Sequence, residues 1–345
     1  MNEERAMIAE TCDRLFAEHL DADVFRAAEA GDFPQGLWDV ITENGLDRIL
    51  VSEEKGGSGL GWEDAEVVLR AAGAHAAPVP LAEAIAAGWM FAGGGHDIPA
   101  GVPTIADAPP VAMTEAGITG ELERVPWGRS ATHVLVDAMR GDALHLAAVA
   151  TSDTRVTADR NIGRDPRDAL TCDKTSVTAW EVSIGTPPLR TLGALVRSCQ
   201  MAGAISAALD LCVTYANERV QFGRPIGRFQ AIQQQLAVMA GEAAAAGVAA
   251  RKACRAVDRF GLDGAGLSAI AAAKIRTGEA AGKTASIAHQ VHGAIGFTDE
   301  YRLHHLTRRL WAWRSEFGAE GAWSEMLGSM IITRGADNLW PDLTG

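Results

Sequence analysis

The fold of this chain is decided by one stretch, Asn217-Glu218-Arg219-Val220-Gln221-Phe222-Gly223-Arg224-Pro225-Ile226-Gly227-Arg228-Phe229-Gln230. One long helical pattern runs into this stretch and another leaves it. Glycine and proline end helices, so we predict a helix-loop-helix corner. Arg219, Arg224 and Arg228 cluster at the break, and the planar guanidinium group suits phosphate oxygens. The corner indicates either a site for an anionic ligand or a solvated arginine cluster, and the rest of the sequence has to decide between them.

The composition is that of a globular protein. The chain has 345 residues, of which 48% are apolar and 22% charged, enough for two or three domains. The net charge of -13 argues against nucleic acid and against anionic membrane surfaces as partners. The cysteines are scattered without a C-x-x-C motif, which favours reduced thiols and a cytoplasmic location, and we predict no metal site. Residues 1–5 lack the features of a signal peptide, and no uninterrupted apolar run approaches a membrane span.

Three regions follow one another along the chain. Residues 1–99 have apolar positions at helical spacing, which predicts an N-terminal helical domain. Residues 100–188 are richer in proline and glycine, and their short alternating or β-branched runs predict a small antiparallel β domain. Residues 189–345 return to long helical patterns with short connections, which is typical of a four-helix bundle. The predicted fold class is therefore mostly α with a central β domain.

Two motifs in this order resemble the signatures of the acyl-CoA dehydrogenase family of flavoproteins. Residues 219–226, Arg-Val-Gln-Phe-Gly-Arg-Pro-Ile, followed by Phe-Gln-Ala-Ile-Gln at 229–233, resemble the family's R-x-Q-F-G-x-P-I and F-Q-x-I-Q patterns. Residues 290–301, Gln-Val-His-Gly-Ala-Ile-Gly-Phe-Thr-Asp-Glu-Tyr, resemble its Q-x-x-G-G-x-G-F-x-x-E-Y pattern. The segments 53–59 and 125–127 match weaker family patterns. The resemblance covers the whole chain and implies an acyl-CoA dehydrogenase-like fold.

In this family FAD lies between subunits, and the two signatures hold the ADP half of a neighbour's FAD. The resemblance therefore implies FAD as cofactor and the following cofactor-binding residues: Arg219, Gln221, Phe222, Ile226, Phe229, Ile232, Gln290, Gly293 and Ala294. Their chemistry agrees, because guanidinium groups pair with pyrophosphate oxygens, aromatic rings offer apolar faces and backbone N–H groups at a helix break bind oxyanions. Ala294 departs from the second glycine of the family's pair, and its methyl group narrows the approach to the backbone.

The family's reaction needs a carboxylate that takes the α-proton of an acyl-CoA thioester, while hydride moves from the β-carbon to the flavin. The resemblance places this glutamate at one of two positions, which fall on Phe317 and near Gly193 here. Neither position holds glutamate. Glu316 lies one residue away and is the one candidate base if the loop shifts. The alternative interpretation is an exposed or ion-paired acid near Arg314.

The expected flavin-ring loop is also incomplete. The family holds the isoalloxazine ring with a T-E-x-x-A-G-S-D loop, whereas Pro110–Gly117 here runs almost directly into Ile118-Thr119-Gly120. The cluster of Arg160, Arg164 and Arg167 with neighbouring aspartates reads as a mixed-sign surface loop. His304 and His305 are predicted to be packing or polar surface residues that point in different directions. The chain thus keeps the residues for the far end of FAD and lacks those for its reactive end.

Three functions remain open at this point. The first, which we expect, is a subunit that completes the FAD site of a full-length acyl-CoA dehydrogenase in a heterotetramer, by resemblance to actinobacterial enzymes that act on CoA thioesters of steroid side chains or rings. The second is a self-sufficient homotetramer with Glu316 as base. The third is a non-catalytic scaffold that binds FAD weakly or not at all. The resemblance also implies an acyl-CoA substrate in the complex and an electron-transferring flavoprotein as acceptor.

Overall fold

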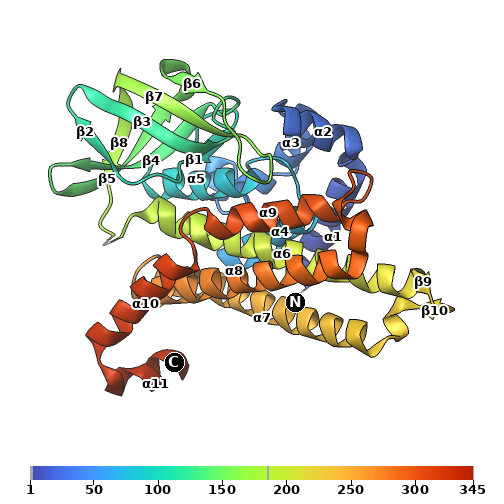
Figure 1. Cartoon of the computed structure of the whole chain (residues 1–345). Coiled ribbons are helices and arrows are strands. Elements are labelled where there is room, and N and C mark those ends of the chain that lie inside the picture. The colour runs from blue at the N-terminus through green and yellow to red at the C-terminus, as the bar shows by residue number, and fades with distance from the viewer. Residues whose placement is uncertain (1–2, 185, 345) are drawn as a thin grey trace.

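The computed structural model describes residues 3–184 and 186–344, with side chains up to residue 341. Residues 1 and 2, on which the signal-peptide expectation partly rests, and the last residue lie outside the described part. Helices form both ends of the chain and a sheet lies between them (Figure 1). This confirms the predicted fold class, mostly α with a central β domain. The exact domain boundaries stay predictions.

The elements follow the predicted order. The N-terminal region consists of α1 (Glu3–His19), α2 (Ala22–Ala30), α3 (Gln35–Glu43), α4 (Trp62–Ala74) and α5 (Leu81–Gly93). The middle region consists of β1 (Pro103–Ile105), β2 (Val111–Thr114), β3 (Gly117–Pro126), β4 (His133–Arg140), β5 (Ala143–Ala150), β6 (Arg155–Thr157), β7 (Arg167–Thr175) and β8 (Val177–Glu181). The C-terminal region consists of α6 (Pro188–Glu218), β9 (Val220–Gln221), β10 (Arg224–Pro225), α7 (Gln230–Phe260), α8 (Gly264–His292), α9 (Leu303–Ser315), α10 (Glu320–Arg334) and α11 (Leu339–Thr344).

The sheet is mixed, which corrects the expectation of a purely antiparallel domain. Its strands run in the order β6-β7-β3-β2-β4-β5-β8, and both β1 and β2 pair in parallel with β4. The β2–β3 hairpin turns at Thr114–Gly117, with Glu115 and Ala116 exposed. The stretch that resembles part of the flavin-ring loop is therefore a strand and an exposed hairpin turn.

Helix α6 forms the core of the bundle. By length and composition it is apolar enough to cross a membrane, but 83% of its apolar window is buried inside the protein. A buried core helix passes the same test as a membrane span, so this is weak evidence for a membrane. The expectation concerned uninterrupted apolar runs, and Arg197 interrupts α6 in the sequence.

Helices α4 and α6 cross at two glycines. A Cβ atom on Gly73 would lie 2.0 Å from the carbonyl oxygen of Gln200, and one on Gly203 would lie 1.9 Å from that of Arg70. The two backbones therefore touch, with no space for a methyl group between them. The position of α6 against the N-terminal helices depends on this contact.

Replacing Gly203 with alanine should therefore separate the two helices. We expect the free energy of unfolding to fall by about 1–3 kcal/mol, measured by urea denaturation, because overpacking forces the backbone to shift. Gly241 of α7 is a matched control, since a Cβ there meets nothing within 4 Å. Gly241→Ala should raise stability by about 0.5–1 kcal/mol, because alanine is the better helix former. Equal effects of the two substitutions would contradict this account of the crossing.

Asp137 of β4 joins the sheet to the first turn of α6. The Leu189 N–H donates to its carboxylate at 3.5 Å, and Asp137 is only 4% exposed. Burial raises the pKa of Asp137 to about 7, although the backbone N–H groups of Leu189 and Arg190 oppose this rise. The folded protein therefore binds a proton at this carboxylate more tightly than the unfolded chain does.

The stability contributed by this proton should decrease with rising pH. Between about pH 4 and pH 7 the folded state holds the Asp137 proton and the unfolded state does not, so the free energy of unfolding falls as pH rises through that window. Asp137→Asn should flatten the fall. The test is the difference between the two proteins' stability profiles, because other carboxylates titrate in both. Parallel profiles would contradict the assignment.

Candidate functional site

The arginine corner is a β-hairpin between two long helices. α6 ends at Glu218, and the Arg219 N–H donates to the carbonyl oxygen of Tyr215 at 2.8 Å. Gln221 and Arg224 are then paired across the β9–β10 ladder, which leaves Phe222 and Gly223 as a two-residue turn. Both turn residues have positive φ angles, +52° and +78°, as type I′ hairpin turns require.

Phe222 is an unusual residue for this turn. Its left-handed backbone costs a non-glycine residue about 1–2 kcal/mol, and its side chain is 92% exposed. Phe229 meets its ring edge-on at a centroid distance of 6.2 Å, and the Arg224 guanidinium lies 4.3 Å from the centroid of the Phe229 ring. Strain of this kind persists where function needs it. The corner therefore exposes an aromatic and cationic surface to solvent.

The second motif is a turn at the end of α8. Gly293 has φ 63° and ψ -140°, a backbone region that is essentially reserved for glycine. Its N–H donates to the carbonyl oxygen of His289, so this group is not free for a ligand as the sequence suggested. Ala294 lies inside the short 3-10 helix η5 (Gly293–Phe297), a conformation that alanine accepts without strain. Gln290 and Ala294 are exposed.

The fold brings the two motifs to one end of the bundle. The ring of Tyr215, one turn before Arg219, stacks on that of His292 with centroids 4.6 Å apart, and His292 directly precedes Gly293. Figure 1 shows β9 and β10 at the end of the bundle that lies away from the sheet. Ile226 and Ile232 are half-buried against the core and support the corner from behind. Guanidinium, amide, aromatic and backbone groups of this kind fit an ADP moiety, and the role of each residue stays a prediction.

The two positions at which the family keeps its glutamate meet at the other end of α6. A Cβ atom on Gly193 would lie 2.1 Å from Cδ1 of Phe317, so the phenyl ring packs directly on the glycine backbone. Phe317 is fully buried, and its N–H donates to Asp107 Oδ2 at 3.0 Å. The two positions that the sequence count identified, far apart in the chain, are therefore neighbours in the structure. A phenyl ring occupies the place where a carboxylate was expected.

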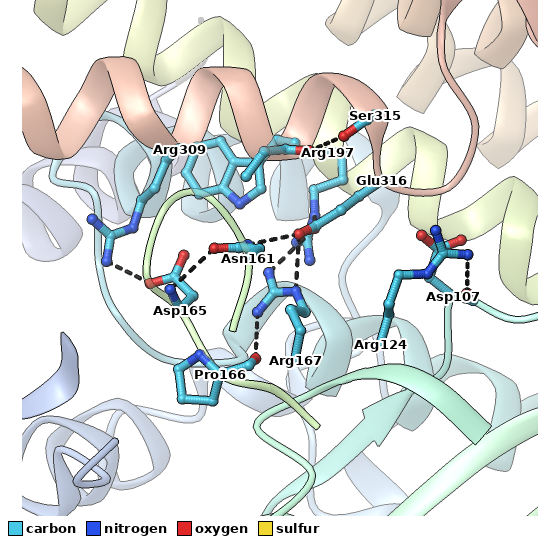
Figure 2. Close-up of polar contacts among 12 residues, drawn as sticks. Asp107, Arg124, Asn161, Asp165, Pro166, Arg167, Arg197, Arg309, Ser315 and Glu316 are labelled. Carbon is cyan, nitrogen blue, oxygen red and sulfur yellow. Dashed lines mark hydrogen bonds and ion pairs between the residues drawn. The ribbon is translucent and has the colours of Figure 1, made fainter. Parts of the chain in front are cut away.

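Glu316 is the centre of a buried ion network (Figure 2). Its Oε1 accepts from Arg167 Nε at 2.9 Å and from Asn161 Nδ2 at 2.8 Å. Its Oε2 accepts from Arg197 Nε at 2.7 Å, and Arg197 pairs in addition with Glu83. Burial alone would raise the pKa of Glu316, but the charges of Arg167 and Arg197 outweigh it and hold that pKa far below its usual range.

This geometry argues against Glu316 as a base. A general base works best with a pKa near the operating pH and with an oxygen free to reach the substrate proton. Both Glu316 oxygens already accept hydrogen bonds from buried side chains. The alternative expectation, an exposed or ion-paired acid near Arg314, holds in its ion-paired form, but the partners are Arg167 and Arg197, since Arg314 pairs with Glu320. Glu316 is a structural ion in this chain.

The cavity that adjoins this network is small. A cavity of about 10 Å³ lies between Trp127, Arg167, Arg197 and Trp313. That is close to the minimum for one water molecule. Trp127, the last residue of a weak family match, is itself buried. We call this part of the chain, from Gly193 and Phe317 to the Glu316 network, the closed centre.

The closed centre and the corner lie far apart on α6. Gly193 and Arg219 are 26 positions apart on this helix, which corresponds to roughly 39 Å. An extended dinucleotide is shorter than this distance. One FAD molecule cannot reach from the corner to the closed centre of the same chain.

The sequence missed the partners of Glu316. Arg167 was interpreted as part of a surface loop, but it is 6% exposed. Its neighbour Arg160 is exposed, as expected. The available signal was Arg197, one of two arginines in the apolar α6 and the buried one of the pair, because a buried charge requires a partner.

His304 and His305 pack against other side chains, as one of the two expected interpretations had it, but not in the expected directions. His304 is buried and its Nδ1–H donates to the Tyr301 carbonyl oxygen at 2.8 Å, while the His305 ring stacks on Phe25. Their ring centroids are only 3.9 Å apart, so the prediction that they point in different directions is wrong. Glu29 approaches both, and these groups could meet at one metal ion. Glu29 is, however, already paired with arginines on neighbouring elements, which disfavours a cation there.

Comparison with known proteins agrees with this architecture. The acyl-CoA dehydrogenase N-terminal domain model matches residues 2–96, and the acyl-CoA dehydrogenase C-terminal domain model matches residues 191–327. The fold and the two turn motifs thus define a flavoprotein dehydrogenase of the three-domain type. The chain belongs to the acyl-CoA dehydrogenase family, and this membership supports FAD as the cofactor.

Individual relatives cover nearly the whole chain. Acyl-CoA dehydrogenase IpdE2 of Mycobacterium tuberculosis is 29% identical over 318 residues, which are 89% of this chain and 91% of IpdE2. A variant of the Tcur3481–Tcur3483 steroid ACAD superimposes with a TM-score of 0.87 at 26% identity, covering 97% of this chain and 99% of that one. The ChsE4–ChsE5 complex from Mycobacterium tuberculosis, at 22% identity and the same coverage, has a TM-score of 0.84 and shows the common fold.

Proposed function

We propose that this chain is a subunit of a heteromeric, FAD-dependent acyl-CoA dehydrogenase. A full-length partner subunit of the same family supplies the catalytic glutamate, the flavin-ring pocket and the acyl pocket. The chain described here supplies the residues that hold the ADP half of the partner's FAD. The complex removes two hydrogens from the α and β carbons of a CoA thioester.

One observation carries the proposal. The same chain has a closed centre and an exposed clamp, by which we mean the Arg219 corner together with the Gly293 turn. The corner exposes Arg219, Gln221 and Phe222, and Phe222 has a strained left-handed backbone there. The closed centre leaves space for about one water molecule. A self-sufficient enzyme would need that centre open, and a scaffold would not need the strained turn.

Each residue of the clamp has its own role in binding FAD. FAD, when bound, supplies the acceptor for hydride. Arg219 contributes a charge-assisted hydrogen bond to a pyrophosphate oxygen, and Gln221 contributes an amide. Phe222 and Phe229 provide apolar faces for the adenine ring. Gln290 and the turn at Gly293 approach from the end of α8, so that both helix ends contact the same half of the cofactor.

The relatives indicate the class of substrate and of partner. The structural likeness to a steroid ACAD supports a steroid side-chain or ring-derived CoA thioester as substrate. The likeness to the ChsE4–ChsE5 complex supports a partner of the same fold, in a heterotetramer. Family resemblance further suggests an electron-transferring flavoprotein as the electron acceptor, and the scattered free cysteines favour a cytoplasmic location.

Flavin stoichiometry tests the proposal. Produced alone, the chain should be free of flavin and inactive. Produced together with a full-length family member encoded beside it, it should co-purify as a yellow complex with half as many flavins as chains. Absorbance spectra and quantitative protein analysis give this ratio. A yellow, active protein made from this chain alone would overturn the proposal and restore the homotetramer as the better account.

A further inference from the structure

Three aromatic side chains lie directly behind the clamp. His292 is the last residue of α8 and is 4% exposed. Tyr215 of α6 stacks on its ring at a centroid distance of 4.6 Å and an interplanar angle of 24°. Tyr301, beyond the η5 turn, approaches the same ring with its hydroxyl oxygen 3.1 Å from Nε2. Tyr215 precedes the first motif along the chain, whereas His292 and Tyr301 both belong to the second.

The hydrogen bonds of His292 define its tautomer. Nδ1 lies 2.8 Å from the carbonyl oxygen of Ala288, which can only accept, so Nδ1 carries the proton. Burial lowers the pKa of His292, which favours the neutral ring. The lone pair of Nε2 therefore accepts from the Tyr301 hydroxyl. Cys212 Sγ, 3.8 Å from Nδ1, fills the remaining side. The ring is held in one orientation.

This cluster connects the end of α6, just before Arg219, to the end of α8, just before Gly293. The Tyr215 carbonyl oxygen accepts from the Arg219 N–H at 2.8 Å, and His292 is followed at once by Gly293. Any shift of the His292 ring would move the end of α8 relative to the end of α6. Binding sites require their groups to stay within about 0.5 Å of the productive geometry, so such a shift would matter.

We propose that Tyr215, His292 and Tyr301 form a positioning cluster that fixes the spacing between the Arg219 corner and the Gly293 turn. Through this spacing the cluster sets the affinity of the clamp for the ADP half of FAD. The inference rests on the proposed function, because it assumes that the clamp holds FAD. The three residues do not themselves touch the cofactor.

Tyr301→Phe is the sharpest test, since it keeps the ring and removes only the hydroxyl. Nε2 of His292 then lacks its donor, which is costly for a buried acceptor. In the isolated chain, hydrogen–deuterium exchange should become faster in residues 219–230 as well as in 290–298, with the rest of the bundle unchanged. In the complex with the partner, the flavin dissociation constant should rise by at least about tenfold. His292→Phe, which keeps a ring to stack on Tyr215, should act in the same direction.

Thr298→Ala is the matched control. It removes a hydroxyl from the same loop, but that hydroxyl donates to the Ile295 carbonyl oxygen and does not touch the cluster. It should leave both exchange and flavin binding unchanged. Unchanged exchange at 219–230 in Tyr301→Phe would overturn the positioning role.

A comparison with Arg219→Ala separates this inference from the function on which it rests. If Arg219→Ala releases flavin and Tyr301→Phe does not, the proposed function stands and the positioning cluster is wrong. If neither substitution releases flavin, the clamp does not hold the cofactor, and both proposals fall. A uniform rise of exchange throughout the bundle would show a merely structural role for Tyr301 and would also overturn the inference.

Discussion

Replacing Arg197 with methionine is expected to lower the free energy of unfolding by about 3–5 kcal/mol, the largest loss of stability that we predict for any single substitution here. Arg197 is 1% exposed and lies between two carboxylates, Glu83 and Glu316. Methionine fills similar space but leaves Glu83 without its ion-pair partner and Glu316 with Arg167 alone. A buried charge without a partner is costly, whereas in the complete network the ion pairs offset much of the desolvation.

Urea denaturation at neutral pH measures this effect. Arg26→Met is the matched control, because Arg26 pairs with Asp23 on the surface and both side chains are largely exposed. It should leave stability almost unchanged. In the double variant Arg197→Met with Glu83→Gln, part of the loss should be regained, since the unpaired negative charge is gone. Equal losses in Arg197→Met and Arg26→Met would refute the ion network as a determinant of stability.

The stability of Arg197→Met also tests whether the closed centre has a structural or a catalytic role. In a catalytic subunit this region must admit a substrate, so it cannot be filled with mutually satisfied charges. Here Asn161, from the loop between β6 and β7, reaches across to Glu316 and ties the sheet to the bundle. A large stability loss on breaking the network would show that the chain uses this region to hold its domains together.

Replacing Arg219 with alanine should release FAD from the assembled complex while leaving the isolated chain's stability unchanged. A charge-assisted hydrogen bond to a pyrophosphate oxygen is lost, which corresponds to a rise of roughly 10- to 100-fold in the flavin dissociation constant. Arg219 is exposed in the isolated chain, and its backbone N–H bond to Tyr215 survives the substitution. The measurement is flavin retained after extensive dialysis, together with the thermal midpoint of the isolated chain.

Arg228→Ala provides the control for charge. Arg228 lies in the short helix η4 (Ile226–Arg228) of the same corner and is also exposed, so both substitutions change the net charge equally. If electrostatic attraction alone holds the cofactor, the two variants should lose flavin to the same degree. Selective loss in Arg219→Ala supports a specific contact. Retention of flavin in both variants would refute the proposal that the clamp holds FAD.

Sequence reasoning reached much of the fold because the relevant signals are local. Helical periodicity, the turn residues around Gly223 and the glycine at 293 each depend on neighbours within a few positions. The positive φ angles at Phe222, Gly223 and Gly293 confirm that helices are broken there. The absence of glutamate at the two family positions is likewise a fact of sequence, and it directed attention to a partner chain.

Only the tertiary structure decided what replaced the missing base. The partners of Glu316 are separated from it by 119 to 155 positions, and no periodicity links Arg197, Arg167 or Asn161 to it. The packing of Phe317 on Gly193 joins α6 to the loop after α9 in the same way. The stacking of Tyr215 on His292 is a third such contact. Sequence by itself determined the elements, the clamp motifs and the absence of glutamate at the two family positions. The closed centre and the spacing of the clamp arise from long-range packing, which local patterns do not encode.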